Sequence, residues 1–405
     1  MELGPIWRAL LRNKTSYSLI ALQIAVTMAI MVNAIGIIQE RSALMARSSG
    51  VDEDNLFYVN SIGFSPDLEF QALVAEDLEA LRNFPGVRNA VMTNTVPLQG
   101  GGWSQGVQVE PGEEFEATSV AIYFVDEHGI DTFGVNLIAG RNFTPTEITW
   151  YDPEGDVRWP PQGIISQAMA AELFPDLDPE EVVGKVTYID DATPVTIIGI
   201  TERMQAAWKS WSGVERSMLV PFKRGENFAR YVIRTKPGYR DEVIPQIEQM
   251  LAESNKGRII RHTRTMTEVR KRSYLEDSAM VKLLVFIVSL LTAITSLGIV
   301  GLASFSVARR TKQIGIRRAL GATQLAILRY FMLENFLVSS VGVLAGAMLA
   351  VALNIWMVQT FELTPVAWYL IPAAMLVLWI VGQLAVYGPA RRASMVSPAV
   401  ATRAV

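Results

Sequence analysis

Four stretches of the chain carry no charged side chain over lengths that would cross a membrane. They are Thr15–Gln39, Leu283–Ala308, Asn335–Phe361 and Leu363–Ala390. Each exceeds the about 20 residues that a helix needs to span about 30 Å of hydrocarbon. The pattern therefore predicts four transmembrane helices, at residues 15–39, 283–308, 331–361 and 363–388.

The segment at residues 40–282 has a different pattern, in which short strand-like and helix-like stretches alternate. Strands are expected at residues 56–59, 87–96, 218–221, 231–235 and 258–261, and amphipathic helices at 66–81 and 240–251. The two ends of the segment thus resemble two β-α-β units that would pair into one α/β layer. The β-rich middle, about 101–214, is predicted to be an inserted subdomain. Residues 264–282 are predicted to form a helical stalk leading into the second span.

Composition agrees with a membrane protein that carries a large water-exposed domain. Half of the 405 residues are hydrophobic, and the mean hydropathy is +0.25. There is no cysteine, and the two histidines lack metal-ligand spacing. Gly184-Lys185 lacks the earlier glycine and the following Ser/Thr of a phosphate-binding loop. With a net charge of −4, nucleic-acid binding is not expected. We therefore expect no enzymatic activity, cofactor or metal in this chain.

The distribution of charge predicts the orientation in the membrane. The segments before the first span, between the second and third, and after the fourth hold twelve Lys/Arg against two acidic residues. Residues 40–282 have a net charge of −13. Because cytoplasmic flanks carry the Lys/Arg excess, residues 1–14, 309–330 and 389–405 are predicted to be cytoplasmic and residues 40–282 extracytoplasmic.

Two features run against this assignment or offer an alternative. The basic triplet Arg270-Lys271-Arg272 lies just outside the second span and is interpreted as a solvated helix face. A cleaved signal peptide in place of the first span is disfavoured by the length of the uncharged run and the lack of a small-x-small site.

The most informative segment is the basic loop after the second span. Residues 308–323 contain five basic residues and no acidic one, with Ile314, Ile316, Ala319 and Leu320 between them. This pattern predicts a short cationic amphipathic helix that ends at Gly321 as its C′ residue. Such a helix could lie on anionic headgroups of membrane lipids or dock into a groove of a cytoplasmic partner, and charge alone does not choose.

Residues 310–322 (RTKQIGIRRALGA) resemble the cytoplasmic-loop motif of the MacB/FtsX family of ABC transporter permeases. The order of one span, a large outer domain and three further spans is similar as well. Further resemblance lies in residues 129–141, 164–184, 389–393 and 397–399. Gln313 departs from the usual Glu, and the chain lacks the common acidic residue after Ala399. MacB carries a fused nucleotide-binding domain, whereas this chain resembles the stand-alone permease type.

The resemblance implies a bacterial inner-membrane permease whose periplasmic domain moves when a separate cytoplasmic ABC ATPase binds and hydrolyses ATP with Mg²⁺. It implies that the ATPase is coupled through Arg310, Thr311, Lys312, Ile314, Gly315, Arg317, Arg318, Ala319, Gly321 and Ala322. A second copy or a paralogous permease, a periplasmic adaptor and an outer-membrane channel are expected partners.

Export of a peptide, antibiotic or lipid-linked molecule is the favoured activity. The alternatives are an FtsX-like signal transmitter that activates an extracytoplasmic hydrolase, and a membrane-anchored sensor or scaffold without ATPase. An adaptor contact is hypothesised near residues 100–106, where three glycines suggest a flexible turn.

Small residues at Gly342, Gly346 and Ala350 recur every four positions in the third span. Such a ridge allows close approach of helix backbones. We favour packing within the subunit over a dimer seam. Gln23 and Asn33, the main polar residues of the first span, are interpreted as packing aids rather than as a conduit.

Overall fold

The computed structural model describes residues 14–66, 68–151, 159–190, 192–225, 227–361 and 364–397. The predicted cytoplasmic N-terminus up to residue 13 and residues 398–405 of the predicted cytoplasmic C-terminus lie outside these ranges. The chain divides into two compact units, residues 46–275 and the remaining residues. We call them the α/β unit and the membrane unit.

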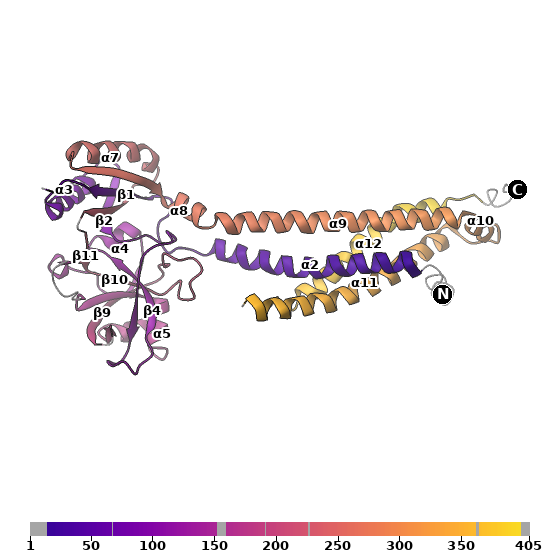
Figure 1. Cartoon of the computed structure of the whole chain (residues 1–405), viewed down its shortest axis with the longest axis horizontal. Coiled ribbons are helices and arrows are strands. Elements are labelled where there is room, and N and C mark those ends of the chain that lie inside the picture. Colours follow the sequence, from indigo (N-terminus) through magenta and orange to yellow (C-terminus); the bar gives the residue numbers. More distant parts are fainter. Residues whose placement is uncertain are drawn as a thin grey trace. The chain divides into compact units, whose positions relative to one another are not determined.

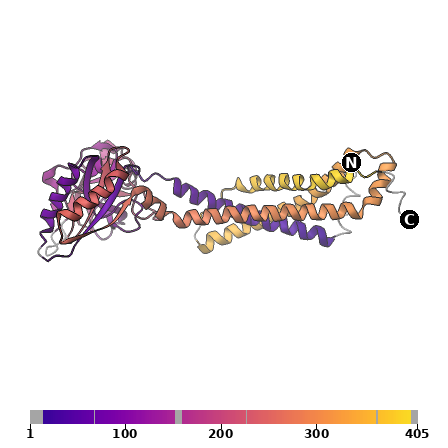
Figure 2. The ribbon, with the colours of Figure 1, turned by 90° about the horizontal axis from the view of Figure 1, so that it is seen from above.

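The membrane unit is built on four long helices that are apolar enough to cross a membrane. They are α2 (Lys14–Ala46), α9 (Leu275–Arg309), α11 (Gln324–Phe361) and α12 (Leu370–Ser394). Figures 1 and 2 show these helices running along the unit, with the short α10 (Thr311–Ala319) between α9 and α11. The predicted fold class, four membrane helices together with an α/β domain, is confirmed.

The helices extend beyond the uncharged stretches because helical hydrogen bonding continues through the charged flanks. Residues 40–45 and 276–282, assigned from the sequence to the outer domain, belong to α2 and α9, where Arg41 pairs with Asp277 at 3.0 Å. Residues 324–330, assigned to the basic loop, form the start of α11. The fourth helix begins at Leu370 rather than at residue 363. Pro365 lies in the connection before it, and proline disfavours the helical conformation in the residue that precedes it.

Polar side chains tie these helices together inside the subunit. The hydroxyl groups of Thr27 (α2) and Thr295 (α9) lie 2.9 Å apart. The Asn33 amide donates to the carbonyls of Ala29 (2.9 Å) and Ala350 (3.2 Å). Asn33 therefore satisfies its own donors and links α2 to α11, as a packing residue does.

The two ends of the α/β unit form one four-stranded antiparallel sheet. Its elements are β1 (Leu56–Gly63), α3 (Phe70–Arg82), β2 (Val87–Thr93), β12 (Phe228–Thr235), α7 (Arg240–Ser254) and β13 (Arg258–Thr265). The strand order β13-β1-β12-β2, with one helix after β1 and one after β12, is that of two interlocked β-α-β units, a ferredoxin-like arrangement. The predicted pairing of the two ends into one α/β layer is thus correct.

A buried ion pair crosses the core of this layer. The Arg258 guanidinium, fully buried, binds both carboxylate oxygens of Asp77, and Tyr231 donates to Asp77 at 2.6 Å. Burial beside the Asp77 carboxylate raises the pKa of Tyr231. These contacts join α3, β12 and β13 and thus hold both halves of the layer in one register.

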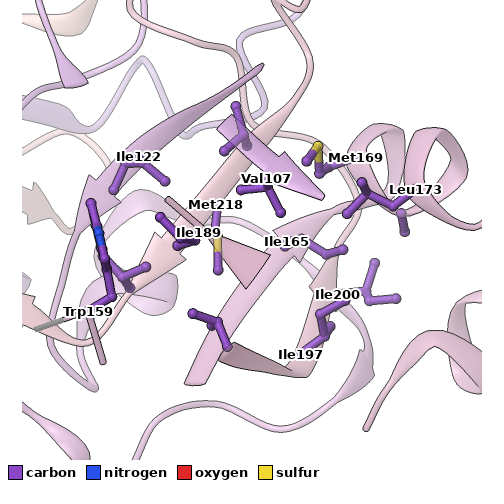
Figure 3. Close-up of a cluster of buried hydrophobic side chains, with 14 of the residues drawn as sticks. Val107, Ile122, Trp159, Ile165, Met169, Leu173, Ile189, Ile197, Ile200 and Met218 are labelled. Carbon is purple, nitrogen blue, oxygen red and sulfur yellow. The ribbon is translucent and has the colours of Figure 1, made fainter. Parts of the chain in front are cut away.

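The inserted subdomain contains a seven-stranded mixed sheet with the order β5-β9-β7-β10-β4-β3-β8, which closes on itself because β8 also pairs with β9. Its strands are β3 (Trp103–Gln108), β4 (Thr118–Phe124), β5 (Leu137–Gly140), β7 (Gln162–Ser166), β8 (Val186–Ile189), β9 (Thr193–Thr201) and β10 (Ser217–Val220). The remaining elements are α4 (Gly129–Phe133), η1 (Pro145–Glu147), β6 (Thr149–Trp150), α5 (Gln167–Leu173), α6 (Pro179–Val182) and β11 (Phe222–Lys223). Figure 3 shows the apolar core of this subdomain, which includes Ile122, Ile165 and Met218.

Two predicted boundaries in the α/β unit were wrong. The strand at 217–220 joins the seven-stranded sheet, parallel to β4 and antiparallel to β7, so the insertion extends past residue 214. The stalk predicted at 264–282 is not one helix: β13 reaches Thr265, α8 covers Met266–Ser273, and Tyr274 separates α8 from α9. Lys209 donates to the Ser273 carbonyl at this break, at 2.6 Å.

The basic triplet in α8 is also only partly solvated. Arg270 donates to both carboxylate oxygens of Glu53, each at 2.6 Å, and to the Arg47 carbonyl at 2.9 Å. Lys271 and Arg272 are exposed, as predicted. Arg270 therefore ties α8 to the start of the α/β unit rather than facing water.

The glycine run before β3 is held by hydrogen bonds. The Gly100 N–H donates to the Ala207 carbonyl (2.8 Å), and the Gly101 carbonyl accepts a hydrogen bond from Thr95. The start of this run is therefore paired with the Ala207 backbone and the Thr95 side chain rather than being a free loop tip.

Candidate coupling site

The basic helix predicted after the second span is α10. It begins after Arg310, whose backbone leaves the helical region, and ends in a C-terminal cap at Gly321, where φ is +98°. The Gly321 N–H donates to the Arg318 carbonyl (3.1 Å) and the Ala322 N–H to the Arg317 carbonyl (3.0 Å). This pair of bonds is the Schellman motif, in which glycine takes the left-handed C′ position without strain.

One face of α10 is buried against the membrane helices. Ile314 is 4% exposed and packs in a cluster with Ile327 and Phe331 of α11 and with Ala390 and Ala393 of α12. Gly315 beside it is buried as well. These two predicted coupling residues therefore lie on the buried face of the helix.

The opposite face of α10 is exposed and combines apolar with cationic side chains. Leu320 is 83% exposed and Ile316 46%. The other exposed residues of this face and of the C-terminal cap are Lys312, Gln313, Arg317, Ala319 and Gly321. A patch of exposed apolar side chains, here Ile316 and Leu320, with a rim of basic residues is typical of an interaction site for a protein or a membrane surface.

Gln313, Ile316 and Leu320 were not among the predicted coupling residues. Helical spacing could have found them, because positions three and four apart lie on the same face. The resemblance pointed to the motif as a whole and did not separate its buried side from its exposed side.

The two adjacent arginines differ in their contacts. The Arg317 guanidinium lies over the Tyr330 ring, 5.1 Å from its centre. Arg318 is partly buried and donates to the Ala322 carbonyl at 3.4 Å. Arg317 therefore contributes charge to the exposed face, whereas Arg318 supports the C-terminal cap together with the partly buried Ala322.

Arg310 is not part of the exposed face. Its Nη1 atom lies 3.1 and 3.2 Å from the two carboxylate oxygens of Glu334, and its Nη2 lies 3.4 Å from the Tyr17 hydroxyl. Tyr17 in turn donates to Glu334 at 2.6 Å. Residues of α2, α11 and the start of the loop thus form one charged network.

Sequence reasoning missed this network because Glu334 and Tyr17 are far from Arg310 along the chain. The available signal was Glu334 itself, the only acidic residue of α11. An ionisable residue at the edge of a membrane span is expected to have a partner.

Thr311 closes the junction between α9 and α10. Its hydroxyl donates to the carbonyls of Val307 and Ala308, both at 3.0 Å. The N–H of Arg310 still donates to the Val307 carbonyl (3.1 Å). Hydrogen bonds therefore join the two helices across the bend.

The small-residue ridge of α11 lies against α2 of the same chain. A Cβ atom added at Gly342 would lie 2.7 Å from the Ala21 carbonyl oxygen, and one at Gly346 would lie 2.5 Å from the Met28 Cβ. Ala350 is buried and accepts the hydrogen bond from Asn33. The ridge therefore brings the backbones of α2 and α11 together within one chain.

Among the described residues, no group of three or more His, Cys, Asp or Glu side chains could hold a metal ion. The exposed face of α10 itself offers apolar area and positive charge, and its buried face packs against α11 and α12.

Comparison with known proteins gives two matching family models. One, described as MacB-like periplasmic core domain, matches residues 15–250. The other, described as FtsX-like permease C-terminal, matches residues 285–398. The second match includes α10 and the three helices around it, and the first includes most of the α/β unit.

Similar full-length proteins include macrolide export ATP-binding/permease proteins MacB. The protein from Azoarcus sp. (strain BH72) is 27% identical over 278 residues, covering 66% of this chain and 41% of its own length. MacB 1 from Yersinia pestis is 24% identical over 410 residues, covering 97% of this chain and 59% of its own. The chain spans about half the length of the relatives it matches.

Two solved structures are also similar. The periplasmic region of MacB from Actinobacillus actinomycetemcomitans is 12% identical with a TM-score of 0.35, covering 57% of this chain and 97% of its own. The extracellular domain of the noncanonic ABC-type transporter YknZ from Gram-positive bacteria is 20% identical with a TM-score of 0.31, covering 51% of this chain and 100% of its own.

Proposed function

Because the chain belongs to the MacB/FtsX family of ABC transporter permeases, we propose that it couples ATP hydrolysis by a cytoplasmic ATPase subunit to movement of its α/β unit. ATP and Mg²⁺ would be bound by that ATPase. The membrane unit of this chain would receive the motion at α10 and transmit it along its helices.

The observation that carries this proposal is the two-sided character of α10. Its inner face is fixed by Ile314 and Gly315 against α11 and α12, and its outer face presents Ile316, Arg317 and Leu320. A partner that binds the outer face can move the helix only by moving what is packed behind it. Docking of an amphipathic helix into a groove is a common mode of recognition and fits this surface.

The proposed orientation places α10 in the cytoplasm and the α/β unit in the periplasm of a bacterial inner membrane. Support comes from the excess of Lys and Arg at the α10 end of the membrane unit and from the acidic character of residues 40–282. Both chain termini would then be cytoplasmic.

Export is the activity we propose for the assembled transporter. The named relatives are macrolide export proteins, so an amphipathic small molecule or peptide is the class of substrate to test first. The assembly would contain a second copy of this chain or a paralogue, a periplasmic adaptor and an outer-membrane channel.

Co-purification from the native membrane tests the coupling proposal. Wild-type chain should recover an ATPase with Walker motifs, and Leu320→Asp should lose it, because a carboxylate cannot enter an apolar groove without cost. Arg317→Glu should weaken recovery, whereas Arg329→Glu, the same charge change at an exposed position outside α10, should not. Unchanged recovery with both Leu320→Asp and Arg317→Glu would rule out docking at α10.

The other proteins in the same eluate separate the alternatives. An adaptor or outer-membrane channel would support export, whereas a cell-wall hydrolase would support the FtsX-like transmitter. Recovery of no ATPase by the wild-type chain would support a sensor or scaffold.

A further inference from the structure

A cavity of about 260 Å³ lies at the end of the membrane unit opposite α10, near the C-terminal ends of α2 and α11. Its walls come from α2, from α11 and from the connection between α11 and α12. Glu40, Gln39 and Asn354 are among its polar lining residues, and Ile37, Met357 and Leu370 are among its apolar ones. Nothing in the coupling proposal uses this cavity.

Hydrogen bonds hold the walls of the cavity in place. Asn354 donates to the Asn33 side-chain oxygen, and the Val366 N–H donates to the Asn354 oxygen, both at 3.3 Å. The Tyr369 hydroxyl donates to Gln39 at 3.3 Å. Gly36 lets Val366 approach α2, since a Cβ there would lie 2.7 Å from a Val366 methyl group. Val366 and Tyr369 of the connection are thus held against α11 and α2.

Glu40 is the only charged residue among the described residues that line the cavity. Within the described part of the chain, its carboxylate makes no ion pair or hydrogen bond, although the side chain is partly buried. The neighbouring Arg41 is engaged with Asp277 at 3.0 Å. A partly buried carboxylate without a partner favours binding of a cation.

Exposed aromatic side chains near the cavity indicate its level relative to the lipid headgroups. Trp356, Phe361, Trp368 and Tyr369 are each at least half exposed and lie at the adjoining ends of α11 and α12. Exposed Trp and Tyr at helix ends gather at the level of the lipid headgroups. The cavity therefore lies where an amphipathic molecule would have its polar head in the interface and its apolar part in the hydrocarbon.

We propose that this cavity binds the head of an amphipathic cation, with an ammonium or similar group against Glu40 and the apolar part along Ile37, Met357 and Leu370. The volume is smaller than the about 300–1,000 Å³ of sites that enclose a whole drug-sized ligand. The site thus takes the charged head and the first part of the apolar body, and the remainder lies among the lipid chains.

Two sources offer this chemistry: an amine-bearing lipid such as phosphatidylethanolamine, and a soluble cationic amphiphile. Both place a positive charge next to an apolar chain at the membrane surface, so the site recognises what they share. Binding to the chain requires no ATPase, so a negative result would not affect the proposed coupling, and failure of the coupling would not affect this site.

The test titrates the purified full chain, in the uncharged detergent dodecyl maltoside, with the fluorescent cationic amphiphile rhodamine 6G and follows fluorescence anisotropy. Wild-type chain should bind the dye saturably. Glu40→Gln should weaken binding at least tenfold, because a charge-assisted contact is lost while the shape is kept. Ala367→Phe, which fills the cavity and keeps the carboxylate, should weaken it as well.

The matched control is Glu276→Gln. Arg41 and Asp277 form an ion pair, and each is preceded in sequence by a glutamate, Glu40 and Glu276. Glu276 is exposed and is not among the residues that line the cavity. Its removal should leave the affinity unchanged. No saturable binding by the wild-type chain, equal affinity of Glu40→Gln, or an equal loss with Glu276→Gln would overturn the proposal.

Competition distinguishes the two sources. Displacement of the dye by phosphatidylethanolamine, but not by phosphatidylglycerol, would identify an amine lipid as the resident ligand. Displacement by neither lipid would identify the soluble amphiphile as the ligand.

Discussion

Arg310 and Glu334 form an ion pair at the α10 end of the membrane unit, 3.1 Å apart, with side chains only 16% and 5% exposed. Tyr17 of α2 donates to the same carboxylate at 2.6 Å. The pair therefore connects the entrance of α10 to two membrane helices. Breaking one partner would leave the other charge buried and uncompensated.

We predict that Glu334→Gln lowers the stability of the membrane unit, since breaking a buried pair costs roughly 3–5 kcal/mol. The thermal unfolding midpoint of the purified chain should fall clearly below that of the wild type. Arg329→Gln removes an exposed cation from the same helix. It should change the free energy of unfolding by no more than about 0.5 kcal/mol, so its midpoint should stay close to that of the wild type. A wild-type midpoint for Glu334→Gln would show that the pair contributes nothing.

Gly346 is predicted to be intolerant of even one added carbon. A Cβ there would lie 2.5 Å from the Met28 Cβ and 2.8 Å from the Ala25 carbonyl oxygen, so α2 and α11 would have to separate. Overpacking of this kind costs about 1–3 kcal/mol. Gly346→Ala should therefore lower the unfolding midpoint of the chain in detergent.

Gly301→Ala is the control for this substitution. Gly301 also lies within a long membrane helix, α9, but an added Cβ meets nothing within 4 Å. Alanine favours a helix by up to about 1 kcal/mol over glycine, so this variant should be as stable as the wild type or more stable. If Gly346→Ala weakened self-association and left the stability of the chain unchanged, Gly346 would serve contact between two copies of the chain rather than packing against α2.

The stability of the α/β unit should depend on pH through Glu147. Two hydrogen bonds from Arg141, at 2.7 and 3.0 Å, and one from the Thr144 N–H lower the pKa of Glu147 to about 2 from an ordinary value of 4.5. A lowered folded-state pKa gives stability that is present above about pH 4.5 and is lost as the pH falls towards 2.

Unfolding midpoints measured between pH 7 and pH 2.5 test this. Glu147→Gln should be less stable than wild type at neutral pH and should lose less of its stability on acidification. Glu116→Gln, at an exposed position, should keep the wild-type slope. An unchanged acid slope in Glu147→Gln would mean that other carboxylates account for all of the pH dependence.

Signals that are local along the chain predicted much of the architecture. Uncharged runs indicated four membrane helices, because a span must satisfy its own backbone and exclude charge over about 20 residues. Gly321 was predicted as the end of the basic helix from its conformational freedom, and it takes that position. The strand and helix order at both ends of the outer domain likewise followed from alternation and turn residues.

The assignment of strands to sheets could not be predicted in the same way. The strand at 217–220 has the same apolar, strand-like pattern as β12, which follows it along the chain. It nevertheless pairs with β4 and β7 rather than with the strands of the β12 sheet. Strand pairing depends on contacts with residues far along the chain, which no local pattern records. The break at Tyr274 is another example, because Lys209 meets the Ser273 carbonyl there only after folding.

For the coupling site, the sequence by itself determined that a basic helix follows the second span and that it ends at Gly321. Only the tertiary structure decided that Ile314 faces inward, that Leu320 faces outward, and that Arg310 is held by Glu334 and Tyr17. Residue type and spacing define a helix and its charge, because those properties depend on neighbours within a few positions. Burial and ion pairing depend on which distant segments arrive beside that helix, as with Arg310 and Tyr17, which are 293 positions apart.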